Sequence, residues 1–233
     1  MEDCVFEWVK SLYIKKNDLC IIGINGIQGS GKTTLCQNLK KRFYNENIVL
    51  EHVSIDDFYK TFDELEEIKR ENEHDFRFHG RGNPGTHDIS LLLNGLLSLQ
   101  HKKTTFFPIY DKTLKDGLGD RSCNVKKVEK NTNIFIIEGW CIGFVPKFIE
   151  ETVDIHVSLY FNIMDYLDGI VILKSDPHNA YKWRKQSEEH QKNGLSSEQI
   201  EEMVDRFFPT YNSYLLSMYE YWSFKPNSLF VDL

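Results

Sequence analysis

One short stretch, Gly26–Thr33, constrains this chain more than any other part of the sequence. It reads "GIQGSGKT" and fits the pattern G-x-x-x-x-G-K-[ST]. The apolar run at 19–24 precedes it and predicts a buried strand, whereas residues 32–45 carry apolar side chains at every fourth position and predict a helix. A strand, a glycine-rich turn and a helix in this order predict a loop that wraps phosphate groups.

Each residue type in this loop has a chemical reason. Glycine leaves the backbone N–H groups free to approach phosphate oxygens, which side chains would block. We expect Lys32 to reach the β- and γ-phosphates and the hydroxyl of Thr33 to coordinate Mg²⁺. The alternative is a glycine turn that binds nothing, but the flanking strand and helix favour a nucleotide such as ATP. The residues predicted to hold its phosphates are Gly26, Gly29, Ser30, Gly31, Lys32, Thr33 and Thr34.

The composition narrows the class of protein. The 233 residues are 41% hydrophobic, which is enough for a buried core, and a net charge of −7 argues against a nucleic-acid partner. Five cysteines without C-x-x-C spacing indicate reduced thiols. The acidic N-terminus carries no signal peptide and no run is long enough to span a membrane, so we expect a cytoplasmic protein, either a monomer or a homodimer.

The order of predicted elements indicates the fold class. Strands are expected at 19–24, 47–55, 104–110, 133–140, 167–175 and 227–233. Helices are expected at 6–14, 32–45, 63–72, 88–100, 179–192 and 196–222, and loops at 76–88 and 111–122. This alternation predicts an α/β phosphate-loop fold with a mostly parallel central sheet flanked by helices. We expect a single domain over 1–233 with a small helical lid at about 177–195, and ligands at the carboxyl ends of the strands.

Acidic residues follow two of these predicted strands. Asp56 and Asp57 come after the second strand in "SIDDFY", and Glu138 ends the strand "IIEGW". If both strands neighbour the phosphate strand, all three carboxylates face the γ-phosphate. There they could orient or deprotonate an attacking hydroxyl, or hold Mg²⁺ together with Thr33. The alternative for either aspartate is a helix cap, and the sequence leaves open which of the two is the base.

Basic side chains lie in three loops of this acidic protein. They belong to "GRGNPGTHD", "YDKTLKDGLGDR" and "YKWRKQ", and the residues concerned are Arg81, Lys112, Arg121 and Arg184. Phosphoryl transfer needs cations on the migrating group and on an anionic substrate. Arg184 is expected to close over the phosphates from the lid, although any one arginine could instead form a surface salt bridge. We interpret His87 as a hydrogen-bonding scaffold, and the aromatic side chains of Trp183, Phe207, Tyr211 and Tyr214 mainly as core.

Several motifs in a fixed order resemble a known family. The phosphate loop with "SIDDFY" looks like the uridine kinase and phosphoribulokinase group. Together with "RGNPGTHD", "PIYDKTLKDGLGDR", "IIEGWCIGF", "WRKQSEE" and "FFPTYNSYL", it resembles the D-glycerate 3-kinases of the plant type and their short homologues. The match runs from about Leu19 to the C-terminus. Pro-Gly-Thr in "NPGTHD" replaces the plant type's usual Ala-Gly-Ser, and the segment after "EGWCIGF" is shorter, as in the short homologues.

The resemblance implies specific roles for residues of this chain. It implies ATP-dependent phosphorylation of the 3-hydroxyl of D-glycerate, with Asp56 as the base and Glu138 associated with Mg²⁺. Lys32, Asp56 and Arg184 are then the catalytic residues, and Thr33, Asp56 and Glu138 the metal-associated ones. The residues implied on the substrate side are Asp57, Tyr59, Arg81, His87, Asp88 and Arg121.

Three functions are compatible with these features. The leading hypothesis is a kinase for a small anionic metabolite, with D-glycerate favoured. A kinase for a nucleoside or a sugar phosphate is the alternative within the same class. Outside it, the loop could serve a non-catalytic ATP-binding switch, which would bind ATP without turnover.

Overall fold

The computed structural model describes residues 1–149, 152–153, 155–183, 186 and 197–233. Strands and helices alternate along most of the chain. The strands are β1 (Cys20–Gly26), β2 (Leu50–Ser54), β3 (Thr105–Asp111), β4 (Asp120–Val128), β5 (Ile134–Glu138), β6 (Phe148–Ile149), β7 (Thr152–Val153), β8 (Gly169–Lys174) and β9 (Ser228–Asp232). The α-helices are α1 (Glu2–Lys16), α2 (Lys32–Asn45), α3 (Phe62–Glu71), α4 (Ile89–Gln100), α5 (Ile155–Phe161), α7 (Ser197–Asp205) and α8 (Phe208–Ser223).

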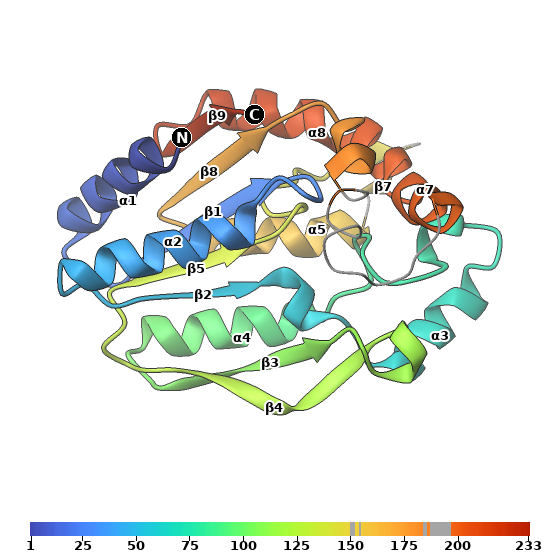
Figure 1. The fold of residues 1–233 in the computed structure, drawn as a ribbon, viewed down its shortest axis with the longest axis horizontal. Coiled ribbons are helices and arrows are strands. Elements are labelled where there is room, and N and C mark those ends of the chain that lie inside the picture. The colour runs from blue at the N-terminus through green and yellow to red at the C-terminus, as the bar shows by residue number, and fades with distance from the viewer. Residues whose placement is uncertain (150–151, 154, 184–185, 187–196) are drawn as a thin grey trace.

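The central sheet is parallel throughout and has the strand order β2-β5-β1-β8-β9. It confirms the predicted α/β class, and the strand predicted at 227–233 is β9, at one edge of the sheet. β1, β5 and the first five residues of β8 are fully buried, because both faces of the sheet are covered. In Figure 1 these strands end on the side where α3 and α7 lie.

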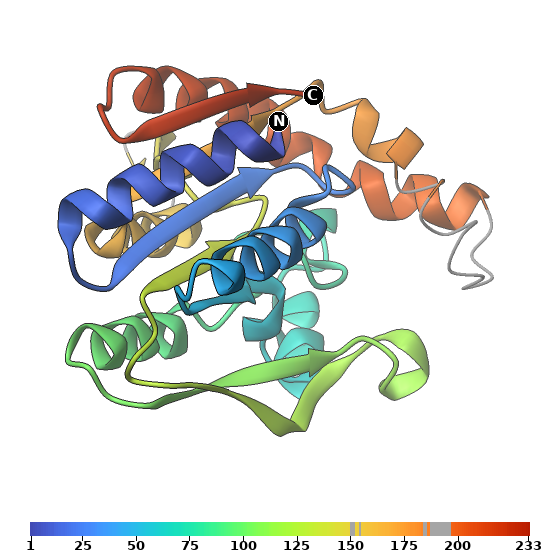
Figure 2. The same cartoon turned by 60° about the vertical axis from the view of Figure 1, so that its left-hand side comes forward.

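Helices cover the two faces of the sheet in separate layers. α1 and α2 pack on one face, against Ile22, Ile24 and Ile136. α4, α5 and α8 pack on the other face, against Ile21 and Ile137, which alternate with the first set along the strands. Figure 2 shows α1 and α2 in front of the sheet. Phe207, Tyr211 and Tyr214 lie in the second layer as predicted, and Trp183 packs against it half-buried.

The strand order answers a condition that the sequence left open. Of the two acidic strands, β5 pairs with β1, through Ile24 and Glu138, and β2 does not. β2 pairs instead with the other side of β5, where Ser54 is opposite Glu138. The segment after β2 therefore lies one strand further from the phosphate loop.

A hairpin outside the central sheet corrects an expectation from the sequence. β3 pairs with β4, antiparallel, so residues 120–122, predicted as the end of a loop, begin a strand that runs to Val128. Four of the nine residues of β4 are exposed, four are partly buried and only Val128 is buried, and the sequence of the strand does not alternate between apolar and polar side chains. The sequence also gives no warning of the short β6–β7 pair or of α5.

The predicted helix 196–222 is two helices. α7 ends at Asp205 and α8 begins at Phe208. Pro209 lies in the first turn of α8, where its missing N–H costs nothing, but inside a continuous helix it would remove a hydrogen bond. The predicted helix 179–192 is helical over 179–183, and most of the remainder lies outside the described residues. Within the part of the chain described, no helix has the length and apolar character that a membrane crossing requires.

Candidate active site

The phosphate loop joins the end of β1 to the start of α2. Gly29 and Gly31 have φ of 80° and 81°, a left-handed backbone that other residues rarely adopt. A Cβ on Gly29 would lie 2.5 Å from the Cβ of Trp183, so the base of the predicted lid packs directly on the loop. Ser30 folds back over Gly26, and its buried hydroxyl has no hydrogen-bond partner among the described residues.

The first turn of α2 is open to an anion. Gly31 is the N-cap and gives the helix no side-chain cap. The first N–H groups of a helix have no partner within the helix, so those of Lys32, Thr33 and Thr34 are available to phosphate oxygens. Thr33 and Thr34 are exposed at this position. The local backbone thus fits the phosphate site that the sequence predicts.

Lys32 and Glu138 place opposite charges beside this turn. The ammonium group of Lys32 donates to the carbonyl of Ile27 at 3.0 Å, which holds the side chain over the loop. Glu138 is 3% exposed and accepts a hydrogen bond of 2.7 Å from the hydroxyl of Thr33. Burial lowers the pKa of Lys32, and the carboxylates of Glu138 and Asp56 oppose that shift. Burial raises the pKa of Glu138, and Lys32 opposes it in turn.

The oxygen atoms at this position fit Mg²⁺. A hydroxyl and a carboxylate, those of Thr33 and Glu138, already lie within hydrogen-bond distance of each other, and Mg²⁺ prefers such oxygen ligands. Within the described residues, no group of three or more histidine, cysteine, aspartate or glutamate side chains could hold a metal by itself. This set therefore fits an ion that takes its other ligands from substrate phosphates and water, as Mg²⁺ usually does.

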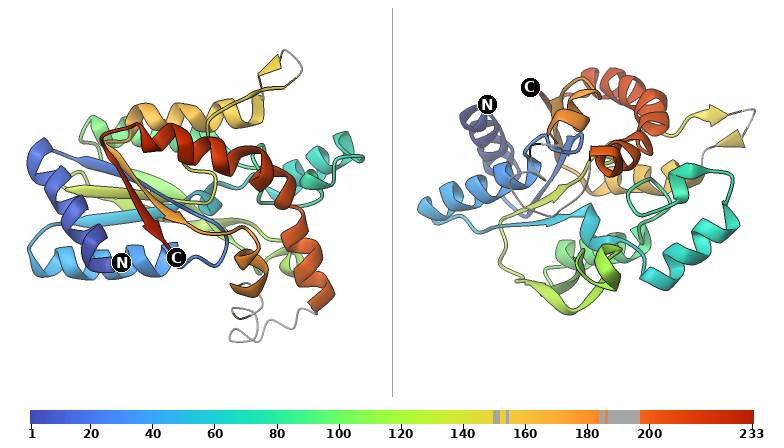
Figure 3. Two further views of the ribbon diagram at one scale, coloured as in Figure 1. Left: turned by 90° about the horizontal axis from the view of Figure 1, so that it is seen from above. Right: turned by 45° about the vertical axis from the view of Figure 1, so that its right-hand side comes forward.

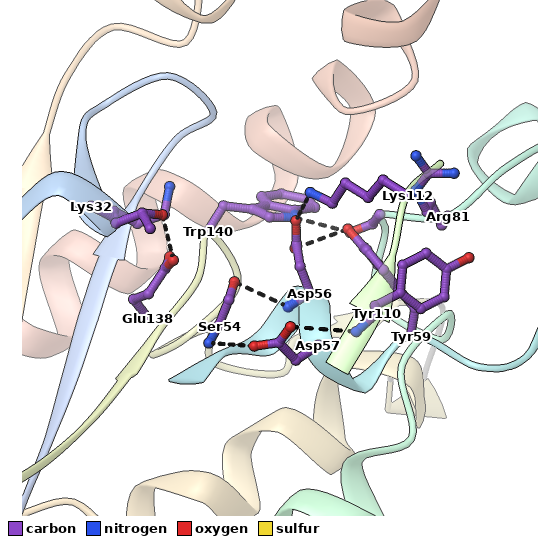
Figure 4. Close-up of polar contacts among 12 residues, drawn as sticks. Lys32, Ser54, Asp56, Asp57, Tyr59, Arg81, Tyr110, Lys112, Glu138 and Trp140 are labelled. Atoms are coloured by element: carbon purple, nitrogen blue, oxygen red, sulfur yellow. Dashed lines mark hydrogen bonds and ion pairs between the residues drawn. The ribbon is translucent and has the colours of Figure 1, made fainter. Parts of the chain in front are cut away.

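The two aspartates after β2 have different environments. Asp57 closes a capping box with Ser54, whose N–H donates to it at 3.2 Å, and the N–H of Tyr110 donates to its other oxygen at 3.5 Å. Asp57 is thus held by the backbone, and burial raises its pKa. Asp56 instead accepts side-chain hydrogen bonds from Tyr59 at 2.9 Å and Lys112 at 2.7 Å. Figure 4 shows these contacts, with Trp140 between them and Lys32 in this view.

The partners of Asp56 keep its carboxylate ionised. Burial alone would raise the pKa of Asp56, but the ammonium group of Lys112, His87 and the Tyr59 hydroxyl hold it well below its usual range. The carboxylate is therefore ionised at neutral pH and can accept a hydrogen bond from a hydroxyl group. Lys112 lies in a basic loop that the sequence singled out, and it reaches this carboxylate from the far end of β3.

Arg81 comes from the loop between α3 and α4 and crosses to the β3–β4 hairpin. Its guanidinium donates to the carbonyl oxygens of Leu118 and Gly117, the latter at 3.3 Å, and lies over the ring of Tyr110. It is half-buried, and the described residues offer it no carboxylate partner. Arg81 thus keeps an uncompensated charge at the edge of the site.

The other residues predicted on the substrate side are held by the protein itself. Asp88 caps α4 by accepting the N–H of Leu91, and Arg121 donates to it at 3.2 Å and to the carbonyl of Tyr59 at 2.9 Å. His87 is buried, stacks on Tyr59 and contacts the hydroxyl of Tyr160 at 2.5 Å. These contacts fix the loop that carries Arg81 and the ring that carries the Tyr59 hydroxyl. Arg184, predicted in the lid, lies outside the described residues.

The structure adds residues that sequence reasoning missed. Trp140 follows β5 and donates its indole N–H to the carbonyl of Gly82 at 2.9 Å, which ties the central strand to the loop of Arg81. Arg206 lies between α7 and α8, and its guanidinium packs against Gly80 of the same loop. Nothing in the local sequence distinguishes Arg206 from an arginine on an exposed helix face. The right-hand view of Figure 3 looks toward the carboxyl ends of the strands of the central sheet.

Comparison with known proteins decides the family. Residues 21–221 match the profile of the phosphoribulokinase / uridine kinase family, which is most of the chain. The chain belongs to this family. Membership in the phosphoribulokinase / uridine kinase family makes it a phosphate-loop kinase and implies the use of ATP. The resemblance noted from the motifs is thereby confirmed.

Relatives within the family carry more specific names. The chloroplastic D-glycerate 3-kinase of Arabidopsis thaliana is 32% identical over 220 residues, 85% of this chain and 48% of that protein, so the chain spans about half its length. The probable ATP-dependent kinase TDA10 of Saccharomyces cerevisiae is 33% identical over 229 residues, 83% of this chain and 77% of that protein. A solved D-glycerate 3-kinase from Cryptococcus neoformans matches with a TM-score of 0.86 and 25% identity, covering 100% of this chain and 95% of that one.

Proposed function

We propose that this chain transfers the γ-phosphoryl group of Mg·ATP to a hydroxyl of a small anionic metabolite, with D-glycerate as the favoured acceptor. One observation carries the proposal. Asp56 places a carboxylate, which is ion-paired with Lys112, just beyond the end of β2, and only β5 separates β2 from β1 and its phosphate loop. A nucleotide-binding switch has no need for such a carboxylate, whereas transfer to an alcohol needs a group that orients the hydroxyl and accepts its proton.

The residues of the chain have distinct parts in the proposed reaction. The N–H groups of the phosphate loop and the Lys32 ammonium hold the phosphates of ATP. As the acceptor oxygen bonds to the γ-phosphorus, its proton moves to Asp56, and the bond between that phosphorus and ADP breaks so that ADP leaves. Thr33 and Glu138, with Asp56 nearby, would hold Mg²⁺, which supplies charge neutralisation on the phosphate oxygens. Arg184 is proposed to add a further cation from the lid.

The acceptor is argued from charge and from the relatives. Arg81 brings to the acceptor side a guanidinium that has no carboxylate partner among the described residues, which suits an acceptor carrying a carboxylate or a phosphate. Two of the relatives above are named D-glycerate 3-kinase, and D-glycerate has a carboxylate next to its hydroxyls. A sugar phosphate is the second candidate, since Arg81 would suit its phosphate equally well.

The decisive test is a screen for phosphorylated products. Purified protein with Mg·ATP is assayed for coupled ADP release with D-glycerate, uridine, pantothenate and sugar phosphates, and products are identified by mass spectrometry. We expect turnover with D-glycerate. Failure to phosphorylate any acceptor would remove the kinase proposal, and turnover only with another acceptor would reassign the substrate.

A matched pair of variants tests the role of Asp56. Asp56→Asn should lower kcat about 10²–10⁴-fold with ATP affinity largely kept, because proton transfer by a positioned side chain contributes about that factor. Asp57→Asn is the control, since its oxygens accept backbone N–H groups and an amide oxygen can retain part of that bonding. Equal activity of the two variants would contradict the assignment.

A further inference from the structure

Arg206 is a second guanidinium at the acceptor side, and no motif of the family resemblance includes it. We propose that Arg206 binds the anionic group of the acceptor together with Arg81, so that these two arginines select a carboxylate or phosphate next to the reacting hydroxyl. This inference rests on the proposed function and adds the residue that sets its substrate class.

The backbone of Arg206 is fixed to the loop of Arg81. The buried amide of Asn83 donates to the carbonyl of Arg206 at 3.0 Å and accepts from the hydroxyl of Thr210 at 2.9 Å. The next residue, Phe207, fills the space beside Gly82, where a Cβ would lie 2.5 Å from its ring. The junction between α7 and α8 is therefore both hydrogen-bonded to this loop and packed against it.

The side chain of Arg206 lies directly on the same loop. A Cβ on Gly80 would overlap Nη1 of Arg206, so the guanidinium occupies the space that a side chain at position 80 would need. The Tyr59 hydroxyl, which donates to Asp56, is 3.8 Å from the corresponding point on Gly82. The segment Gly80–Gly82 thus has Arg206 at one end and the partner of the proposed base at the other.

Among the described residues, Arg206 has no ion-pair partner for its charge. The side chain is half-buried and forms no ion pair within the part of the chain that the structure describes. Burial lowers its pKa, Arg81 adds like-charge repulsion, and only Tyr59 and the exposed Glu202, one turn earlier on α7, act in the opposite direction. A partly buried guanidinium beside a second one is unfavourable unless an anion joins them.

The chemistry of guanidinium groups defines the missing anion. Each presents a planar fork of N–H donors that matches the oxygens of a carboxylate or a phosphate. Arg81 directs Nη1 to the carbonyl groups of the β3–β4 hairpin, which orients the guanidinium but leaves its charge unmatched. An anion held by both arginines would place the rest of a small acceptor toward Tyr59 and Asp56.

Steady-state kinetics of Arg206→Gln test the inference. We expect the KM for D-glycerate to rise about 30-fold, in line with the loss of a charge-assisted hydrogen bond, while the KM for ATP stays unchanged. Arg206→Lys should recover part of the loss, because it restores the charge without the fork. Arg70→Gln removes an exposed arginine from α3 and is the matched control. An unchanged KM for D-glycerate in folded Arg206→Gln would overturn the inference.

Binding measurements separate this inference from the proposed kinase activity. Calorimetric titrations of D-glycerate, ribose 5-phosphate and uncharged glycerol are made in the presence of a non-hydrolysable ATP analogue. We expect one of the two anions, but not glycerol, to bind wild type, and Arg206→Gln to lose that binding. If wild type binds the anion without turning it over, the kinase proposal fails and the inference stands. If wild type phosphorylates only neutral acceptors, or Arg206→Gln binds the anion as well as wild type, the inference fails.

Discussion

Asn83 is the structural link between the acceptor loop and α8, and its removal has a cost that can be worked out in advance. Its side chain is 2% exposed. Nδ2 donates to the carbonyl groups of Arg77 and Arg206, both at 3.0 Å, and Oδ1 accepts from the hydroxyl of Thr210 at 2.9 Å. Asn83→Ala removes all three hydrogen bonds at once.

The expected loss follows from these three bonds. Each contributes a net ~1 kcal/mol, so Asn83→Ala should lower the free energy of unfolding by about 3 kcal/mol. For a domain of this size that corresponds to a fall in Tm of roughly 6–12 °C. A cavity of about 10 Å³ beside Asn83 can admit a water molecule after truncation, which favours the lower end of that range.

Urea denaturation of wild type, Asn83→Ala and Asn83→Asp measures the effect. Asn83→Asp keeps the shape and the acceptor for Thr210 but presents a carboxylate to two carbonyl groups, so it should be at least as unstable as Asn83→Ala. A loss below about 0.5 kcal/mol in Asn83→Ala would refute the reasoning, because it would mean that the three bonds are replaced at no cost.

Three further predictions concern stability and the site. Burial lowers the pKa of His87 to about 4 from an ordinary 6.5. As the pH falls from 6.5 toward 4, the unfolded chain therefore binds a proton at this residue that the folded chain does not bind, and the free energy of unfolding decreases. Between pH 7 and 5 the expected loss in the free energy of unfolding from His87 is about 2 kcal/mol, and denaturation of His87→Gln should no longer show it. The pKa of His52 is also lowered to about 4, and its contribution remains in both proteins. Gly29→Ala and Gly31→Ala should each lose about 1 kcal/mol of stability, because both positions have a left-handed backbone. Gly29→Ala should also melt at a lower temperature than Gly31→Ala and bind ATP more weakly, since only its Cβ would meet Trp183. Equal melting temperatures of the two variants would contradict this. Trp140→Phe removes the hydrogen bond to Gly82 and should raise the KM for the acceptor about 5- to 10-fold, with the KM for ATP unchanged. A similar rise in the KM for ATP would argue against an effect specific to the acceptor loop.

The parts of the fold that the sequence predicts are those with strong burial. β1, β5 and β8 are apolar runs because both of their faces are covered, and a short apolar run of that kind is typical of a central strand in a parallel sheet. β4 was missed because its residues face solvent and carry polar side chains, so no period-two pattern forms. Strand order leaves no mark on a single sequence, which is why the neighbours of β2 stayed open until the structure placed it beside β5.

Some residues of the candidate site could be predicted from neighbouring residues in the sequence, whereas others are recognised only from contacts between distant segments. Lys32 and Thr33 belong to one contiguous motif, so their positions follow from it. The choice between Asp56 and Asp57 could have been made, because Ser54 and Asp57 have the spacing of a capping box and Asp56 does not. Arg206 could not have been found, since its importance comes from Gly80, a residue more than a hundred positions earlier that only the fold brings into contact with it.

The position of β5 between β1 and β2 sets the distance between the ends of these two strands. Neighbouring strands lie about 4.8 Å apart, so the ends of β1 and β2 are roughly 10 Å apart, and the hydrogen bonds of three strands hold that gap constant. In the proposed reaction the phosphates of ATP bind at the end of β1, and the acceptor hydroxyl binds near Asp56 beyond the end of β2. The sheet would then keep the donor and acceptor sites at a constant spacing, while the loops beyond β2 remain free to diverge toward other acceptors.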